Sequence, residues 1–323
     1  MKLGTGGGIT RREALGVAAA AGASCAACAP RSAAGARGGA PRLRLGVSTL
    51  GFDKHTNADL ARELAAERIR VVQLFLNQAD SRFWKYNGTS DVSSLTPERC
   101  RAIADSYRSA GIEIHSIGVY TNLIHPQEEE RQAALAYFEA MMKAGAAMGV
   151  RTFITEAGHY RGREPEPPVP LHFQESVWAQ MVATVRKLAE TAGRFDATVL
   201  LEPFFRGFLA SAKRTRVFIE EVNSPRIGAL LDPANLLEVN DLGEMFDQLG
   251  PRIGCLHAKD RKMHVDRGVP AGQGDLDYDR FLRLAAERTP SAPLVLEYVG
   301  PKDYRDAFAH VRAAMKRAGI EEA

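Results

Sequence analysis

Cysteine is scarce in this chain, which has four cysteines among 323 residues. Cys25 and Cys28 lie near the N-terminus, so only Cys100, in a predicted helix, and Cys255, in a predicted strand, belong to the body of the sequence. Two isolated thiols do not indicate a disulfide framework. The pattern excludes the small disulfide-stabilised class of secreted domain, and a hydrophobic fraction of 45% is sufficient for an ordinary packed core.

An excess of positive charge is also missing once the N-terminus is set aside. The formal net charge is +3, but residues 1–41 hold five Lys and Arg residues against Glu13 alone, which leaves about −1 on residues 42–323. Such a body offers no electrostatic surface for nucleic acid or for an anionic membrane. We therefore expect a neutral or weakly charged small-molecule substrate and no nucleic-acid partner.

No apolar run is long enough to span a membrane. The nearest candidate follows Arg11-Arg12 and continues through Ala and Gly residues to Ala29, which resembles a twin-arginine export signal. The sequence predicts a cleavable signal over residues 1–29, a flexible linker over 30–41 and export to the bacterial periplasm, with Cys28 as an alternative point for a lipid anchor. A cytosolic protein with a disordered Ala-rich tail is the other interpretation. The sequence does not fix the oligomeric state, and a homo-oligomer is one of the options.

After residue 42, short β-branched apolar runs alternate with longer segments of helical periodicity. This alternation predicts βαβ units and a parallel sheet. Eight strands, each followed by a helix, match the size of a single-domain (β/α)8 TIM barrel over residues 42–323. The eight apolar runs are Leu43–Leu50, Ile69–Leu76, Ile112–Tyr120, Val150–Thr155, Thr198–Leu201, Ile227–Leu231, Ile253–Leu256 and Leu294–Leu296.

Local signals mark where several helices begin and end. Asn57, Thr96 and Ser176 are predicted to start helices, and Ala110-Gly111 and Ala192-Gly193 to end them. A doubly wound open sheet is the alternative fold. Against it, the first strand is not followed by the G-x-G-x-x-G motif of dinucleotide-binding sheets.

The last four strands each end in a residue that can bind a hard cation: Glu202, Asp232, His257 and Glu297. Because active sites of such barrels lie at the carboxyl ends of the strands, these side chains should converge there. Three buried acids without a compensating cation would be unstable, so a metal is expected among them. Three carboxylates and one imidazole favour one divalent ion, Mn²⁺, Mg²⁺ or Co²⁺, over Zn²⁺.

At these positions the sequence resembles the xylose isomerase-like TIM barrel superfamily, in its sugar phosphate isomerase/epimerase branch. The resemblance implies that the four strand-end residues bind the metal and that Glu202 and Glu297 also act as catalytic acid and base. Its ketose 3-epimerases carry a substrate-orienting His where this chain has Asn235, and an Arg that matches Arg267. The motifs are Glu202-Pro203, Leu231-Asp232-Pro233-Ala234-Asn235-Leu236, His257-Ala258-Lys259-Asp260, Gly272-Gln273-Gly274-Asp275-Leu276-Asp277 and Leu296-Glu297-Tyr298, with Tyr120-Thr121-Asn122-Leu123 after the third strand.

Further polar residues at strand ends are candidates for substrate contact. The predicted substrate-binding residues are Asn235, Arg267, Lys259, Glu156, Asn122 and Gln73. Trp84 and Trp178 are candidates for stacking on a sugar ring. No cluster of Lys and Arg is evident at the last strand ends, which favours a sugar without a phosphate group.

The expected reaction is isomerisation or epimerisation of a sugar. A base removes the proton next to a carbonyl, and a divalent cation stabilises the enediolate oxygens. A metal-dependent lyase or dehydratase acting on a keto-sugar or inosose would begin with the same proton abstraction and stays the alternative. A non-catalytic carbohydrate-binding protein would not need two opposed glutamates, and the apurinic endonuclease branch of this fold needs more histidines.

Overall fold

The computed structural model describes residues 40–160, 170–265 and 267–323. The predicted signal over 1–29, most of the linker and Cys28 lie outside the described residues. Ala40–Ala323 forms one compact unit. No helix within the described ranges is long and apolar enough to cross a membrane.

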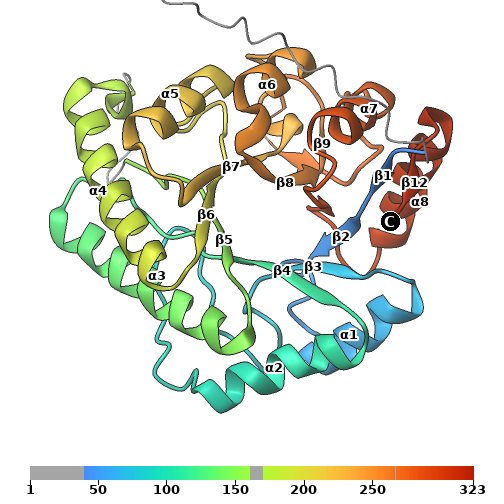
Figure 1. Ribbon diagram of the computed structural model, residues 1–323, viewed down its shortest axis with the longest axis horizontal. Coiled ribbons are helices and arrows are strands. Elements are labelled where there is room, and N and C mark those ends of the chain that lie inside the picture. The colour runs from blue at the N-terminus through green and yellow to red at the C-terminus, as the bar shows by residue number, and fades with distance from the viewer. Residues whose placement is uncertain (1–39, 161–169, 266) are drawn as a thin grey trace, which may run out of the picture. The chain divides into compact units, whose positions relative to one another are not determined.

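Eight parallel strands close into a barrel (Figure 1). Strand β11 closes it, because it pairs with both β8 and β2. This closure excludes the open doubly wound sheet and confirms the predicted (β/α)8 barrel. Each strand lies within or next to its predicted apolar run. The barrel strands are β2 (Leu45–Ser48), β3 (Val71–Leu74), β4 (Glu113–Gly118), β5 (Thr152–Thr155), β6 (Thr198–Leu201), β7 (Ile227–Leu231), β8 (Ile253–Ala258) and β11 (Leu294–Leu296).

One helix follows each barrel strand, and together the helices surround the barrel (Figure 1). They are α1 (Asn57–Ala66), α2 (Pro97–Ser109), α3 (Glu128–Met148), α4 (Glu175–Arg194), α5 (Ala212–Val222), α6 (Leu242–Leu249), α7 (Tyr278–Arg288) and α8 (Tyr304–Ala318). Two short pairs lie outside the barrel: β1 (Arg42–Leu43) with β12 (Glu321–Glu322), and β9 (Asp260–Arg261) with β10 (Gly268–Val269).

Three of the predicted helix boundaries were wrong. Thr56, not Asn57, caps α1, because its side chain accepts a hydrogen bond from the Asp59 amide. The Asn57 side chain is buried and donates to Asp80 and Ser81. Helix α4 begins after Gln174 rather than at Ser176, and it continues through Gly193 to Arg194. The left-handed residue that follows it is Asp196, at φ 49°.

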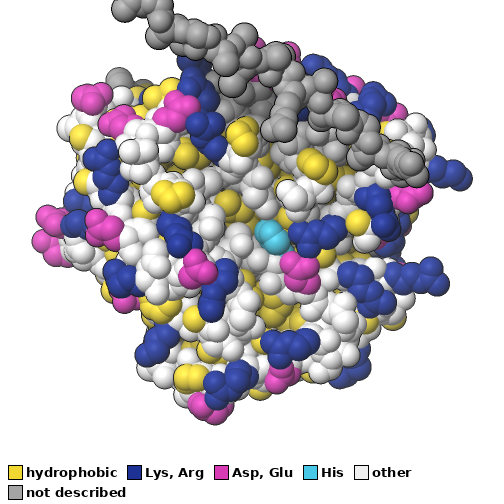
Figure 2. All heavy atoms as spheres, in the orientation of Figure 1, with side chains coloured by type: hydrophobic (Ala, Val, Ile, Leu, Met, Phe, Trp, Pro, Cys, Tyr) yellow, Lys and Arg dark blue, Asp and Glu magenta, His cyan; other side chains and the backbone are white. Residues whose placement is uncertain are grey.

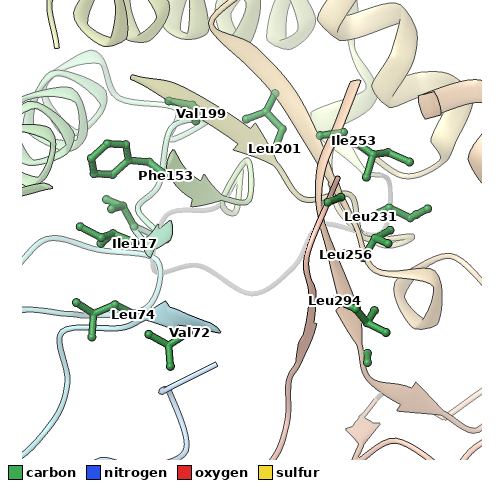
Figure 3. Packing of buried hydrophobic residues seen from close by; sticks show 14 of the residues in the cluster. Val72, Leu74, Ile117, Phe153, Val199, Leu201, Leu231, Ile253, Leu256 and Leu294 are labelled. Atoms are coloured by element: carbon green, nitrogen blue, oxygen red, sulfur yellow. The ribbon is translucent and has the colours of Figure 1, made fainter. Parts of the chain in front are cut away.

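The core has two layers because alternate residues of a strand point to opposite faces. Outward-facing residues such as Val199, Leu201 and Leu231 pack in the layer beneath the helices, and Figure 3 shows part of this layer around the ring of strands. Inward-facing residues fill the barrel interior and form a separate cluster of Phe75, Tyr120, Ile154, Leu200, Leu230, Cys255 and Val295. This second layer forms the floor on which the site is built.

The outer surface carries both signs of charge. On the face that Figure 2 shows, Lys and Arg side chains are interspersed with Asp and Glu, and neither sign covers the face alone. This agrees with the near-zero net charge expected for residues 42–323.

Candidate metal centre and active site

Successive side chains of a strand point to opposite faces, and this alternation decides that the four strand-end side chains point into the barrel. Each follows an inward-facing core residue by two positions, so its own side chain also points into the barrel. The pairs are Leu200 and Glu202, Leu230 and Asp232, Cys255 and His257, and Val295 and Glu297.

These four side chains meet at one point. One ligand atom from each of Glu202, Asp232, His257 and Glu297 lies within 4.8 Å of the others, and all four residues are buried. The convergence predicted from the sequence is therefore present. Three carboxylates and an imidazole match the donor preference of a divalent cation.

The His257 imidazole is oriented by Gln73 on β3. Its Nε2 lies 2.6 Å from Gln73 Oε1 and donates to that oxygen. Its Nδ1 faces Glu202 Oε1 at 3.4 Å and Glu297 Oε2 at 3.5 Å, and has no hydrogen-bond partner among the described residues. A ring held at one nitrogen by a polar partner, with the other nitrogen facing carboxylates, is the arrangement of a metal-binding histidine.

The carboxylates are also held in place. Tyr120 donates its hydroxyl to Glu202 Oε2 at 2.6 Å, and the Asn235 amide donates to Glu202 Oε1 at 2.9 Å. Asp232 precedes the short 3₁₀ helix η2 (Pro233–Asn235), and its Oδ1 accepts from the Ala234 amide. These bonds fix the ligand atoms on rigid elements, and the four residues fit a bound divalent ion.

Lys259 enters the same cluster, which corrects the expectation that no side-chain cation compensates the acids. Its Nζ lies 2.6 Å from Asp232 Oδ2 and 3.3 Å from Glu297 Oε2, and it donates to Asn235 Oδ1 at 2.9 Å. We therefore infer a bound metal from the geometry of the four donors, because Lys259 already supplies positive charge to the acids.

The pKa values reflect this mixture of burial and charge. Burial raises the pKa of Asp232 to about 6, although the Lys259 charge opposes the change. Burial acts in the same direction on Glu297, but the charges of His257 and Lys259 outweigh it and lower the pKa of Glu297 to about 2. Although burial opposes protonation of Lys259, the neighbouring acids, Asp232 first, raise its pKa well above the ordinary value.

A cavity of about 540 Å³ opens above this cluster. Aromatic side chains make up much of its wall: Phe75, Trp84, Tyr86, Tyr120, Phe204 and Tyr298. Charged and polar groups enter it from the strand ends: Glu156, Glu202, Asn235, Lys259, Arg261, Arg267 and Glu297. Apolar walls with a few convergent polar groups are typical of sites for small molecules.

Comparison with known proteins places the chain in a family. Residues 59–316 match the model of the xylose isomerase-like TIM barrel. This chain belongs to that family. L-ribulose-5-phosphate 3-epimerase of Escherichia coli (strain K12) is 22% identical over 294 residues, which are 87% of this chain and 92% of the relative.

Two solved structures share the family fold. The 3-keto-D-glucoside 4-epimerase from E. coli superposes with a TM-score of 0.66 at 18% identity, over 84% of this chain and all of that one. The probable 3-DHS dehydratase from Bacillus anthracis superposes with a TM-score of 0.67 at 16% identity, over 85% of this chain and 100% of that one. At these identities the likeness concerns the fold.

Within this xylose isomerase-like barrel, the predicted substrate contacts divide into two groups. Asn235, Arg267, Lys259 and Glu156 line the cavity, whereas Gln73 and Asn122 lie outside its wall. Gln73 instead bonds His257, and the Asn122 amide donates to the His159 carbonyl at 2.9 Å.

The two tryptophans divide in the same way. Trp84 lines the cavity. Trp178 instead packs against Phe208 and Phe218, and its Nε1 donates to Glu221.

Glu156 is the carboxylate at the end of β5, on the cavity wall beside Glu202. Tyr86 donates its hydroxyl to Glu156 Oε2 at 2.9 Å. Burial and then the charge of Glu202 raise the pKa of Glu156 to about 8. This acid is therefore mostly protonated at neutral pH, unlike Glu297.

Among the wall residues that were not predicted from the sequence are Tyr86 and Arg261. Tyr86 belongs to a long loop without regular periodicity. Arg261 had a readable signal, because His257, Lys259 and Arg261 are alternate residues and continue one face of the strand. Lys259, Arg261 and Arg267 together bring three cations to the cavity, which contradicts the expected lack of a Lys and Arg cluster there.

Proposed function

We propose that this protein is a divalent-metal-dependent sugar isomerase or epimerase. The observation that carries the proposal is the pair Glu202 and Glu297, which line the cavity and also belong to the cluster of candidate metal ligands. A divalent ion such as Mn²⁺, Mg²⁺ or Co²⁺, held by Glu202, Asp232, His257 and Glu297, would supply positive charge that stabilises the enediolate.

The two glutamates are suited to complementary proton transfers. They stand on β6 and β11, three strands apart around the barrel, so they reach a bound carbon from different sides. One carboxylate removes the proton next to the carbonyl, and the other acid returns a proton to the enediolate. Return to the same carbon inverts it, and return to the neighbouring carbon moves the carbonyl.

Neighbouring groups orient the substrate and the acids. Asn235 donates to Glu202 and accepts from Lys259, so it links one of the two proposed proton-transfer acids to the cluster's only lysine within the described residues. The Lys259 ammonium is placed to stabilise negative charge on substrate oxygens. The aromatic wall, with Trp84 and Tyr298, suits the apolar face of a sugar. The E. coli relative, named as an L-ribulose-5-phosphate 3-epimerase, supports the same reaction class.

A lyase or dehydratase is the second candidate, and Glu156 is the observation that favours it. An acid that holds its proton at neutral pH can protonate a departing hydroxyl. After the first proton is removed, loss of the neighbouring C–O bond with transfer of the Glu156 proton would release water. The reaction product separates this candidate from isomerisation.

Deuterium uptake tests the proposal. The Mn²⁺-loaded protein would be incubated in D₂O with free ketoses, 3-keto-glycosides and inososes, and the products followed by NMR and mass spectrometry. We expect exchange at the carbon next to the carbonyl for at least one substrate. We expect it to be lost in Glu297→Gln and Glu202→Gln, and kept in Glu113→Gln, a change at an exposed glutamate of β4. Exchange that survives in Glu297→Gln would refute the assignment, and an unsaturated product would favour the lyase.

We also propose that the chain is exported to the periplasm. The support is the Arg11-Arg12 pair followed by the Ala-rich run in the sequence. Fractionation of cells that express the full chain should place it in the periplasm, and replacing both arginines with lysine should retain it in the cytoplasm. Incorporation of labelled palmitate that depends on Cys28 would identify a lipid anchor. Cytoplasmic location of the unaltered chain would contradict export.

A further inference from the structure

A short hairpin, formed by β9 and β10, brings two arginines to one side of the cavity. Arg261 on β9 pairs with Gly268 on β10, and Arg267 comes directly before Gly268. The side chain of Asp260 holds the hairpin to the following loop, because its two oxygens accept the amides of Leu276 and Gly272, each at 3.1 Å. The arginines are therefore carried by a fixed element.

Arg261 is buried to an unusual degree for an arginine. Its exposed fraction is 2%, yet it lines the cavity. The guanidinium lies 4.2 Å from the centre of the Phe205 ring, and its Nε lies 3.1 Å from Glu238 Oε1. Its Nη2 has no hydrogen-bond partner within the described part of the chain. A buried guanidinium with an unused donor is costly unless something accepts from it.

The acids that line the cavity do not supply that acceptor. Glu202 accepts from Tyr120 and Asn235, and Glu297 pairs with Lys259. Glu156 bonds Tyr86 and holds its proton at neutral pH. A divalent ion at the carboxylate cluster would add further positive charge. Among the described residues, the acids that line the cavity are thus engaged elsewhere and leave the Nη2 of Arg261 without an acceptor.

We propose that Arg261, together with Arg267 just before the facing strand, binds an anionic substituent of the substrate, a phosphate or a carboxylate group. The planar fork of a guanidinium suits either group. The substrate is then a sugar phosphate or a sugar acid rather than a neutral sugar. This inference rests on the proposed function, because it concerns the same cavity, and it identifies Arg261 as a residue that determines specificity.

Binding experiments test the inference without turnover. Titration calorimetry of the Mn²⁺-loaded protein would use L-ribulose 5-phosphate, L-ribonate and neutral L-ribulose as probes. We expect Arg261→Met to weaken binding of the preferred anionic probe by about 10- to 100-fold and to change L-ribulose by less than about twofold. Lys262→Met is the matched control, because Lys262 is the next residue and is exposed. It should change the binding of neither the anionic probe nor L-ribulose. The phosphate and the carboxylate probe identify which anion the site takes.

Glu238→Gln gives a prediction of opposite sign and covers the case in which Arg261→Met does not fold. Glu238 is the counter-ion of Arg261 among the described residues, so neutralising it should tighten binding of the anionic probe by about three- to tenfold. Equal losses for charged and neutral probes in Arg261→Met, or unchanged anion binding in a folded Glu238→Gln, would overturn the inference. Absence of deuterium exchange with L-ribulose 5-phosphate itself, when its binding is intact, would instead count against the proposed function alone.

Discussion

The Gln73 amide oxygen accepts the Nε2 proton of His257 across the barrel, at 2.6 Å. This bond leaves Nδ1 as the nitrogen that faces the carboxylates. Replacing Gln73 with Leu should release the ring and weaken divalent-metal affinity by about 10- to 100-fold, measured by calorimetry with Mn²⁺. Gln78→Leu is the matched control, because Gln78 is equally buried but donates to the Thr49 carbonyl. Equal affinity in both variants would show that Gln73 does not orient the ligand.

Replacing Lys259 with Met should destabilise the metal-free protein. The change leaves Asp232 and Glu297 without their nearest side-chain cation, and breaking such a buried pair costs about 3–5 kcal/mol. Thermal unfolding should therefore show a lower midpoint, and added Mn²⁺ should raise that midpoint by more than in the unaltered protein. Lys262→Met serves again as the exposed control. A larger effect of the metal on the unaltered protein would contradict the role given to Lys259.

The raised pKa of Glu156 predicts a pH dependence of stability. Between its ordinary value of 4.5 and the folded value of about 8, the folded state keeps a proton that the unfolded state has lost. Folding stability from this group therefore falls as pH rises through that window. Glu156→Gln does not titrate, so its stability relative to the unaltered protein should increase by on the order of 4 kcal/mol between pH 5 and pH 8.5. Unfolding midpoints across this range test it, and a constant difference would show that Glu156 is ionised throughout.

Gly274 should not tolerate a side chain. A Cβ there would lie 2.2 Å from Asp260 Oδ1 and 2.4 Å from the Arg261 amide, so Gly274→Ala must displace the base of the hairpin. We expect a loss of about 1–3 kcal/mol in the free energy of unfolding, measured with denaturant. Gly193→Ala is the control, because nothing lies within 4 Å of its Cβ in α4, and it should gain about 0.5–1 kcal/mol. Similar values for the two variants would contradict this account.

Much of the fold could be predicted because it depends on patterns that the chain repeats. The eight strands appear as apolar runs, and the ligand positions follow from strand alternation, so Glu202 and Glu297 could be placed together before any coordinates were known. The helix boundary at Asn57 could not, because a tertiary contact decides it. Asn57 looks like a cap, but Asp80 and Ser81 bind its side chain and Thr56 takes the capping position.

The charged part of the site was harder to predict for a similar reason. Lys259 follows a strand end and looks solvated in the sequence, yet its long side chain reaches the acids inside the barrel. Arg261 continues the alternation of His257 and Lys259, but it lies beyond the end of β8 in the two-residue strand β9, where only the pairing with Gly268 fixes its position. Both cases depend on contacts between residues that are distant along the chain.

The pairing of β1 with β12 joins Arg42 to Glu321 and Leu43 to Glu322. Strand β1 leads into the amino end of β2, and α8 returns the chain to that same end, so both segments lie at the opposite end of the barrel from the cavity. A tether attached near residue 40 or near residue 323 would therefore leave the mouth of the barrel pointing away from its support. Immobilised through either end, the protein should keep unobstructed access for substrate.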